Sequence, residues 1–228
     1  MPELLCFAHR GASGHEPENT LRAVRKALDL GAPWLEIDVH RAQDRIVVIH
    51  DARLERTTSG EGTVASASLA YLRALDAGRG ERIPFLEEVL DLVAGRAGLN
   101  VELKGRGTAA PVAAILSERV RRGVCRPDQF LVSSFHLLQL MTFRKLAPAI
   151  PVGVLVAHTS LPYFEIAVKL GAHSIHVRLD QLSEKFVARA HARRLRVYVF
   201  TVNTPVELQR VRRLGADGIF TDFPDLIT

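Results

Sequence analysis

The sequence predicts a (β/α)8 TIM barrel with a small insertion after the second strand and a truncated last helix, in a single domain that spans residues 1–228. Two patterns predict this fold. Short runs rich in β-branched residues alternate with amphipathic segments of about ten to fifteen residues along the chain. The predicted strands number eight, and no linker or break in composition divides them, which favours a closed parallel barrel over an open doubly wound sheet.

The regular elements follow one another in the order that a barrel requires. The strands are expected at 4–8, 34–39, 99–103, 130–135, 152–157, 174–177, 196–202 and 218–221. The segments between them that have the period of a helix include 18–32, 85–95, 110–123, 161–172, 183–195 and 205–216. Several of these segments end in Gly-Ala directly before the next strand, and glycine is the residue that most easily adopts the left-handed conformation at a helix end.

Two segments depart from strict alternation. A strand at 45–50 follows the second strand too closely for a helical crossover, so it should return antiparallel as a hairpin. If the chain turns near Asp44, position 38 lies opposite position 50, which would bring His50 beside Asp38. Residues 51–83 are then expected to form a loop insertion at the barrel mouth, with one short helix at 68–75.

The last strand is followed by only seven residues, DFPDLIT. The eighth helix should therefore be a stub or absent, and one flank of the barrel should be thinly covered. A homodimer that covers this flank is therefore a hypothesis of the sequence analysis.

Composition and charge narrow the class of protein. The chain is 47% hydrophobic and 24% charged, which is typical of a globular protein with a substantial core. No apolar run approaches the roughly 18 residues of a membrane span, and Met1-Pro2-Glu3 leads directly into a strand, so we expect a cytoplasmic protein without stable membrane insertion. The net charge of +5 comes from basic residues spread over helix faces, and without a binding motif it does not indicate nucleic acid.

Charged residues stand at the ends of three predicted strands, where barrel enzymes place their catalytic groups. His9 and Arg10 follow the first strand. The pairs Glu36/Asp38 and Glu102/Lys104 lie on the second and third strands, and each pair shares one face because its members are two residues apart. Each feature alone has an ordinary structural explanation, as a turn, an edge strand or a rim ion pair, but their coincidence at three strand ends favours a site.

The residue types suggest what such a site does. Inward carboxylates are costly to bury unless they are paired or bind a cation, and an all-oxygen set suits Mg²⁺ or Ca²⁺ better than zinc. Two histidines suit proton transfer near neutral pH, and an arginine suits a phosphate. His176 is also expected at the barrel mouth, whereas Pro17-Glu18-Asn19-Thr20 has the composition of a helix start.

Taken together, the motifs resemble the glycerophosphodiester phosphodiesterase family. The matching stretches, in the family's order, are AHRG (8–11), PENT (17–20), LEIDVH (35–40), VVIHD (47–51), RTTSGEG (56–62), IPFLEEVL (83–90), VELK (101–104), VFTVN (199–203) and DGIFTDFPDLI (217–227). Two departures are visible. Phe200 stands where the family commonly has tryptophan, and the turn RAQDR lacks the glycine usual after the family's aspartate.

The resemblance implies a metal-dependent phosphoric diester hydrolase that converts small-molecule glycerophosphodiesters to glycerol 3-phosphate and an alcohol. The implied metal ligands are Glu36, Asp38 and Glu102, which would hold one divalent cation, Mg²⁺ or Ca²⁺ with Mn²⁺ also admissible. The implied acid–base residues are His9 and His50, and the implied substrate-binding residues are Arg10, Lys104 and Phe200. The sequence does not decide which histidine is the acid; His9 as acid and His50 as base is our working hypothesis.

Two alternatives stay open at this stage. A lysophospholipase D-like phosphodiesterase that acts on a lipid would need an apolar entry surface, which the polar 51–83 insertion does not obviously offer. A non-catalytic barrel that binds a phosphate ligand would be expected to have lost a metal ligand or a histidine, and the sequence has lost neither.

Overall fold

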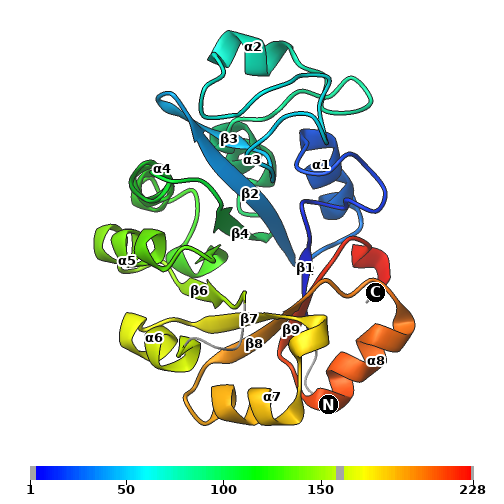
Figure 1. The fold of residues 1–228 in the computed structure, drawn as a ribbon, viewed down its shortest axis with the longest axis vertical. Coiled ribbons are helices and arrows are strands. Elements are labelled where there is room, and N and C mark those ends of the chain that lie inside the picture. The colour runs from blue at the N-terminus through cyan, green and yellow to red at the C-terminus, as the bar shows by residue number, and fades with distance from the viewer. Residues whose placement is uncertain (1–3, 158–161, 227–228) are drawn as a thin grey trace.

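The computed structural model describes residues 4–157 and 162–226, and it confirms the predicted TIM barrel (Figure 1). Eight parallel strands form the barrel wall, and β1 closes it by pairing with both β2 and β9. The strands are β1 (Leu5–Ala8), β2 (Trp34–Ala42), β4 (Gly98–Leu103), β5 (Phe130–Ser134), β6 (Val152–Leu155), β7 (Ser174–Arg178), β8 (Arg196–Phe200) and β9 (Gly218–Thr221).

Helices cover the outside of the barrel (Figure 1). They are α1 (Leu21–Asp29), α3 (Leu86–Val93), α4 (Ala109–Arg121), α5 (Leu137–Leu146), α6 (Tyr163–Leu170), α7 (Glu184–His191) and α8 (Pro205–Leu214). Sequence-local caps set their ends: the Thr20 hydroxyl accepts from the backbone of α1, and Gly215 ends α8 at a φ of 76°. The expected segment at 161–172 begins with residue 161, which lies outside the described residues. Helix α5 is an addition to the expected segments, and its Leu138 and Met141 are exposed, which weakens its amphipathic pattern.

The hairpin forms as predicted, but its register differs by one residue. Strand β3 (Arg45–Val48) pairs antiparallel with β2, and the match of Ala42 with Arg45 leaves a two-residue turn. Position 38 therefore lies opposite 49, where the backbone N–H of Ile49 donates to the Asp38 carbonyl oxygen at 3.0 Å; the expected pairing of 38 with 50 is wrong. A shift by one residue would turn the side chain at 50 to the opposite face of a regular ladder. Because β3 ends at Val48, His50 is free of that rule and still faces the barrel mouth.

The insertion packs around its own apolar side chains. Its short helix, α2 (Leu69–Ala74), lies within the expected 68–75 and far from the barrel axis in Figure 1. The buried side chains that it shares with β2, β3 and the adjoining loops are Ala42, Val47, Ile49, Leu54, Val64, Leu72, Leu75, Ala77 and Ile83. The apolar residues of this segment thus stabilise the insertion itself.

After β9 the described chain contains only a short 3-10 turn, Pro224–Leu226. The predicted stub in place of a helix after the last barrel strand is therefore confirmed as far as residue 226. Within the described ranges, no helix has both the length and the apolar character needed to cross a membrane.

The barrel interior has an aromatic floor with a polar layer above it. Phe7 packs against Phe220 and Tyr198, with ring centroids 4.6 and 4.9 Å apart. His176 lies next to this floor, 5.2 Å from the ring of Phe220, and its Nε2 is 2.8 Å from Ser174 Oγ. This floor closes the barrel below its mouth, so any ligand must bind at the carboxyl ends of the strands.

The buried His176 predicts acid sensitivity of the fold. Burial, together with the nearby His173, lowers the pKa of His176 from 6.5 to about 3. Between these two values the unfolded chain binds a proton that the folded protein excludes, so stability contributed by neutral His176 is lost as the pH falls. We expect His176→Gln to reduce the loss of unfolding free energy between pH 7 and pH 4 by about 3 kcal/mol, measured by urea titration. Parallel profiles for the two proteins would contradict this prediction.

Candidate active site

Three buried carboxylates meet at the mouth of the barrel. Glu36 and Asp38 lie on β2, and the strand register places Asp38 beside Glu102 of β4. All three are more than 90% buried, and one carboxylate oxygen from each lies within 4.8 Å of the others. The two-residue spacing on one strand and the parallel pairing of two strands therefore produce one cluster, as the sequence predicted.

The loop after β1 supplies the first neighbours of this cluster. The backbone N–H of Arg10 donates to Glu36 Oε2 at 2.9 Å, and its side-chain Nε lies 3.3 Å from Asp38 Oδ2. The loop can turn here because Gly11 has a φ of +77° and its missing Cβ would lie 2.6 Å from the backbone carbon of Ala23. The loop thus packs directly on α1 while Arg10 faces the carboxylates.

The cluster has more negative charge than its neighbours offset. Glu36 Oε1 is buried and has no hydrogen-bond partner among the described residues, while Lys104 Nζ lies 3.0 Å from Glu102 Oε1. Burial and the charge of Asp38 raise the pKa of Glu36 well above its usual value and that of Glu102 to about 7. Burial alone would raise the pKa of Asp38 too, but Arg10 and other nearby cations outweigh this effect. The pKa of Asp38 is therefore lowered, and its carboxylate stays ionised. A hard divalent cation fits this set of oxygens, because it would supply the missing positive charge.

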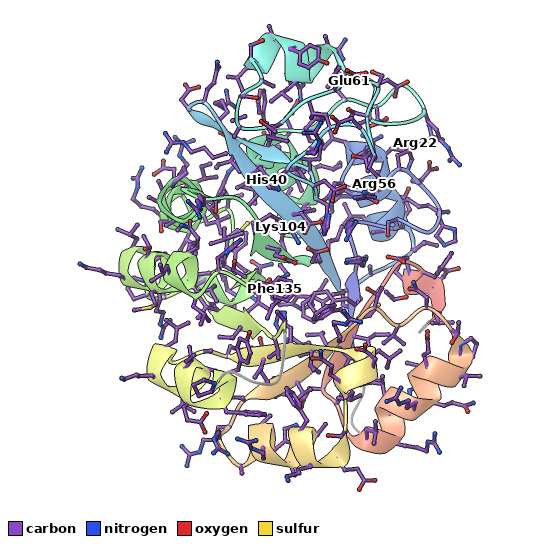
Figure 2. All side chains as sticks on the ribbon, in the orientation of Figure 1. Arg22, His40, Arg56, Glu61, Lys104 and Phe135 are labelled. Atoms are coloured by element: carbon purple, nitrogen blue, oxygen red, sulfur yellow. The ribbon has the colours of Figure 1, made fainter. Side chains whose placement is uncertain are left out.

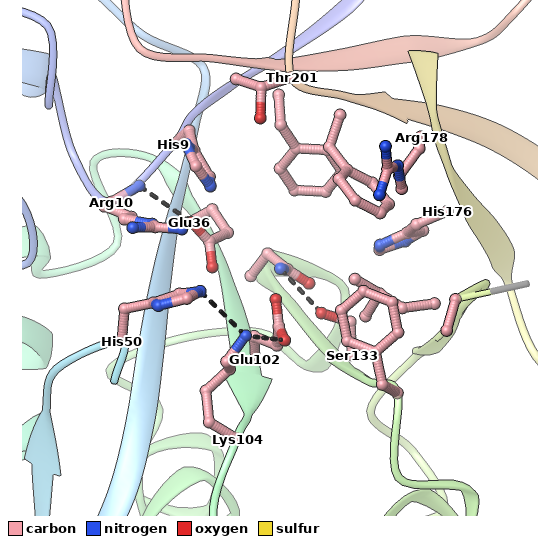
Figure 3. Close-up of a pocket in the computed structure, with 16 residues that line it drawn as sticks. His9, Arg10, Glu36, His50, Glu102, Lys104, Ser133, His176, Arg178 and Thr201 are labelled. Carbon is pink, nitrogen blue, oxygen red and sulfur yellow. Dashed lines mark hydrogen bonds and ion pairs between the residues drawn. The ribbon is translucent and has the colours of Figure 1, made fainter. Parts of the chain in front are cut away.

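His9 is held by a carboxylate from the other end of the chain. Its Nδ1 lies 2.6 Å from Oδ1 of Asp222, which follows β9. Asp222 is itself fixed by Ser13 Oγ at 2.9 Å and by Asn203 Nδ2 at 2.6 Å. Burial raises the pKa of Asp222, but these donors and His9 outweigh that effect and lower it to about 2. The arrangement leaves the other ring nitrogen of His9, Nε2, for the cavity (Figure 3).

His50 has different partners. Its Nδ1 lies 2.5 Å from Asp51 Oδ1, and its Nε2 lies 3.1 Å from Lys104 Nζ. An ammonium group has only hydrogens to offer, so Nε2 must accept and the ring is neutral, with its proton at Nδ1. Burial lowers the pKa of His50, in agreement with a neutral ring.

A chain of ion pairs ties the insertion to the mouth. Arg56, from the insertion, pairs with Asp51 and donates two hydrogen bonds of 2.9 Å to Glu18. Glu18 also accepts from Arg10 Nη1 at 2.8 Å. Figure 2 shows Arg56 on the α1 side of the barrel and Lys104 over the strands. Arg56 therefore links the carboxylate that holds His50, Asp51, to the carboxylate that holds Arg10, Glu18.

The cavity between these groups has a volume of about 380 Å³. Seven of the eight residues singled out in the sequence line it, namely His9, Arg10, Glu36, His50, Glu102, Lys104 and Phe200. The eighth, Asp38, lies beneath the surface of the cavity at 1% exposure. His176 also lines the cavity, as expected from the sequence.

Sequence reasoning missed the residues that hold these groups in place. The stretch 17–20 does begin a helix at Thr20, but Glu18 and Asn19 also serve the site. Asn19 has a φ of 59° and donates from Nδ2 to Asp38 Oδ2 at 2.9 Å. The sequence signal that could have pointed to Asn19 was its place directly before Thr20, the residue that caps the helix. For Asp222 the signal was a carboxylate at the end of the last strand, in the position that barrel enzymes use for catalytic groups.

This combination of groups suits a phosphate ester: cations for the phosphate oxygens, carboxylates for a metal ion, and two histidines for protons. The class that fold and site define is therefore the TIM-barrel phosphodiesterases. Residues 9–226 match the model of the glycerophosphoryl diester phosphodiesterase family, and the chain belongs to this family.

Known relatives agree over almost the full length. A glycerophosphodiester phosphodiesterase of Bacillus altitudinis is 37% identical, with 96% of this chain and 94% of the relative covered. A glycerophosphodiester phosphodiesterase of Caldanaerobacter subterraneus is 32% identical over 98% of this chain and 96% of that protein. The solved structure of an Oleispira antarctica phosphodiesterase, in complex with the product sn-glycerol-3-phosphate, superposes with a TM-score of 0.90 at 31% identity and covers 100% of this chain and 95% of the other.

Proposed function

We propose that the protein hydrolyses glycerophosphodiesters to glycerol 3-phosphate and an alcohol, with the help of one divalent cation. The observation that carries the proposal is the cavity in which three buried carboxylates, two carboxylate-bound histidines, an arginine and a lysine converge. The product bound to the related Oleispira antarctica phosphodiesterase supports the same substrate class.

Glu36, Asp38 and Glu102 would hold the cation. When bound, it supplies positive charge to the phosphate and lowers the pKa of a coordinated hydroxyl group. An oxygen-only ligand set favours Mg²⁺ or Ca²⁺, and Mn²⁺ would also be accepted. Arg10 and Lys104 would pair with the phosphate oxygens, and Phe200 would form part of the substrate wall.

The two histidines would divide the proton transfers. In the first step the glycerol 2-hydroxyl oxygen bonds to phosphorus and the bond from phosphorus to the alcohol oxygen breaks. His50 Nε2 takes the proton of the hydroxyl once the phosphate draws Lys104 away, and His9 Nε2 gives a proton to the departing alcohol. Asp222 supports that role because a carboxylate on Nδ1 stabilises the doubly protonated ring. Water then opens the cyclic phosphate with the roles reversed.

Glycerol 3-phosphate release tests the proposal. Glycerophosphocholine and glycerophosphoethanolamine would be incubated with protein that has been stripped by a chelator and then given Mg²⁺, Ca²⁺ or Mn²⁺. Product that appears only after an ion is restored is the expected result. The absence of product with every ion would refute the proposal for small diesters.

Asp222 allows a test of the proton route itself. We expect Asp222→Asn to lower kcat about 100-fold with KM little changed, because the amide cannot stabilise the protonated form of His9. The limb of the pH–rate profile that reports the general acid should also move along the pH axis, which a purely structural role for Asp222 would not cause. Asp225→Asn, in the same segment but beside the partly exposed His15, is the matched control and should retain wild-type rates.

Small diesters are favoured over lipids by the insertion. Its apolar side chains are buried in its own cluster, and among the described large apolar residues of 51–83 only Tyr71 is exposed. We also propose a cytoplasmic location, which the two free cysteines support, because oxidising compartments favour disulfides. A homodimer over the flank behind β9 is a further proposal, and sedimentation would test it.

A further inference from the structure

We propose that Arg178 forms a subsite for the alcohol part of the substrate and selects alcohols that carry negative charge over alcohols that carry positive charge. The inference rests on the proposed function and adds the substrate class. It concerns the half of the cavity that lies away from the three carboxylates, which is lined by Phe135, Leu155, Ala157, Arg178 and Phe200.

The strand pattern directs Arg178 into this half. Side chains two apart on β7 share a face, so Ser174, His176 and Arg178 all point toward the barrel axis. Ser174 and His176 are fully buried, and Arg178, the last residue of the strand, reaches the mouth. Figure 3 shows its guanidinium group above His176, across the cavity from His50 and Glu102.

The charges in this half are one-sided. Among the described residues that line the cavity, the carboxylates are Glu36 and Glu102, and both belong to the cluster of three carboxylates that would hold the cation. Asp180 pairs with Arg178 at 2.7 and 3.1 Å, but it lies outside the cavity lining. Within the cavity lining, a cationic alcohol would therefore meet the guanidinium group of Arg178, while the Asp180 carboxylate that pairs with it lies outside that lining.

A shallow hollow continues the cavity outward. It shares Arg178, Phe200 and Thr201 with the cavity, and Leu179, Asp180 and Arg210 also line it, so that two arginines face one carboxylate there. An alcohol with a terminal carboxylate or phosphate would reach two arginines there, while its apolar part packs on Phe200. His176 on the floor adds no charge of its own, because burial lowers its pKa and keeps it unprotonated.

The competing reading is an aromatic subsite for a quaternary ammonium group. Phe135 and Phe200 stand edge to face with their ring centroids 6.0 Å apart, and such faces attract cations. Lys104 Nζ already lies 5.7 Å from the ring of Phe135, which places a cation near that ring before a substrate arrives. The charge balance favours the anionic alcohol, and the experiment decides between the two.

The test compares three substrates that differ at one nitrogen: glycerophosphoethanolamine, its N-acetyl derivative and its N-succinyl derivative, with a cationic, a neutral and an anionic alcohol. For the wild-type protein at low salt we expect kcat/KM to be threefold to tenfold higher for the N-succinyl diester than for the free amine, because Arg178 is half-exposed and solvent weakens its field. Arg178→Ala should remove the contrast, Arg178→Glu should invert it, and added salt should reduce it.

Arg196→Ala is the matched control, because Arg196 begins the neighbouring strand β8 at the opposite end of the barrel and is equally exposed. A contrast that persists in Arg178→Ala, or faster turnover of the free amine by the wild-type protein, would overturn the inference. Binding of the three diesters to His9→Ala, measured by calorimetry, tests the Arg178 subsite separately from the proposed function. If the wild-type protein turned over none of them, the proposed function would fail, while the order of binding would still decide whether Arg178 selects the charge.

Discussion

We expect His9→Ala and His50→Ala each to lower kcat for glycerophosphoethanolamine at least 1000-fold, within the range that positioned acids and bases contribute. Both rings are only partly buried and face the cavity, so their removal should leave the cooperative unfolding transition in place. Circular dichroism and urea unfolding check the fold, and a coupled assay for glycerol 3-phosphate checks the rate. His191→Ala, which changes a histidine paired with Asp217 at the surface, is the control and should keep full activity.

A second substrate separates the acid from the base. In a glycerophosphodiester whose alcohol part is p-nitrophenol, the leaving group departs as p-nitrophenolate and needs no proton from the protein. We therefore expect His9→Ala to release p-nitrophenolate, the product of the first step, at most of the wild-type rate, whereas His50→Ala should release it slowly. Recovery in the His50 variant instead would reverse the two roles, and near-native activity of either variant with glycerophosphoethanolamine would remove that residue from the mechanism.

We expect the substitutions Glu36→Gln, Asp38→Asn and Glu102→Gln to abolish the response of the protein to divalent cations. The wild-type protein, stripped by a chelator, should gain thermal stability on addition of Mg²⁺, Ca²⁺ or Mn²⁺, by about 2.7 kcal/mol when the free ion is at 100 times its Kd. Each variant removes one charge from a cluster whose oxygens lie within 4.8 Å of one another, so this gain should largely disappear and turnover should fall at least 1000-fold.

The cation-free state provides an independent readout. Three buried carboxylates repel one another, so cation-free Glu36→Gln should unfold at the same temperature as the cation-free wild-type protein or a higher one. Glu118→Gln, an exposed acid on α4, should respond to cations like the wild type. An equal thermal gain in Glu36→Gln and the wild type would mean that the cation binds elsewhere.

The elements of the barrel were predictable because their signals are local. The alternation of β-branched runs with amphipathic segments places each strand, and a two-residue spacing places Glu36 and Asp38 on one face whatever the remainder of the chain does. Helix α5 escaped this reasoning because its exposed Leu138 and Met141 blur the apolar stripe on which the method depends.

The partners of the functional groups were less predictable. Asp51 adjoins His50 in the sequence, yet its role as a hydrogen-bond partner appears only when Arg56 of the insertion is seen to hold it. The hairpin register shows the same limit: a symmetric turn about Asp44 was a reasonable estimate, and a turn of two residues moved the pairing by one position.

The sequence by itself determined the barrel, the strand ends at which the polar groups gather, and the chemical character of the site. Only the tertiary structure decided which groups touch. His9 and Asp222 are 213 residues apart and meet because β1 pairs with β9 to close the barrel. The physical reason is that periodicity records which face of one element is buried, whereas a contact between elements depends on closure, turn length and register, which no single stretch of sequence contains.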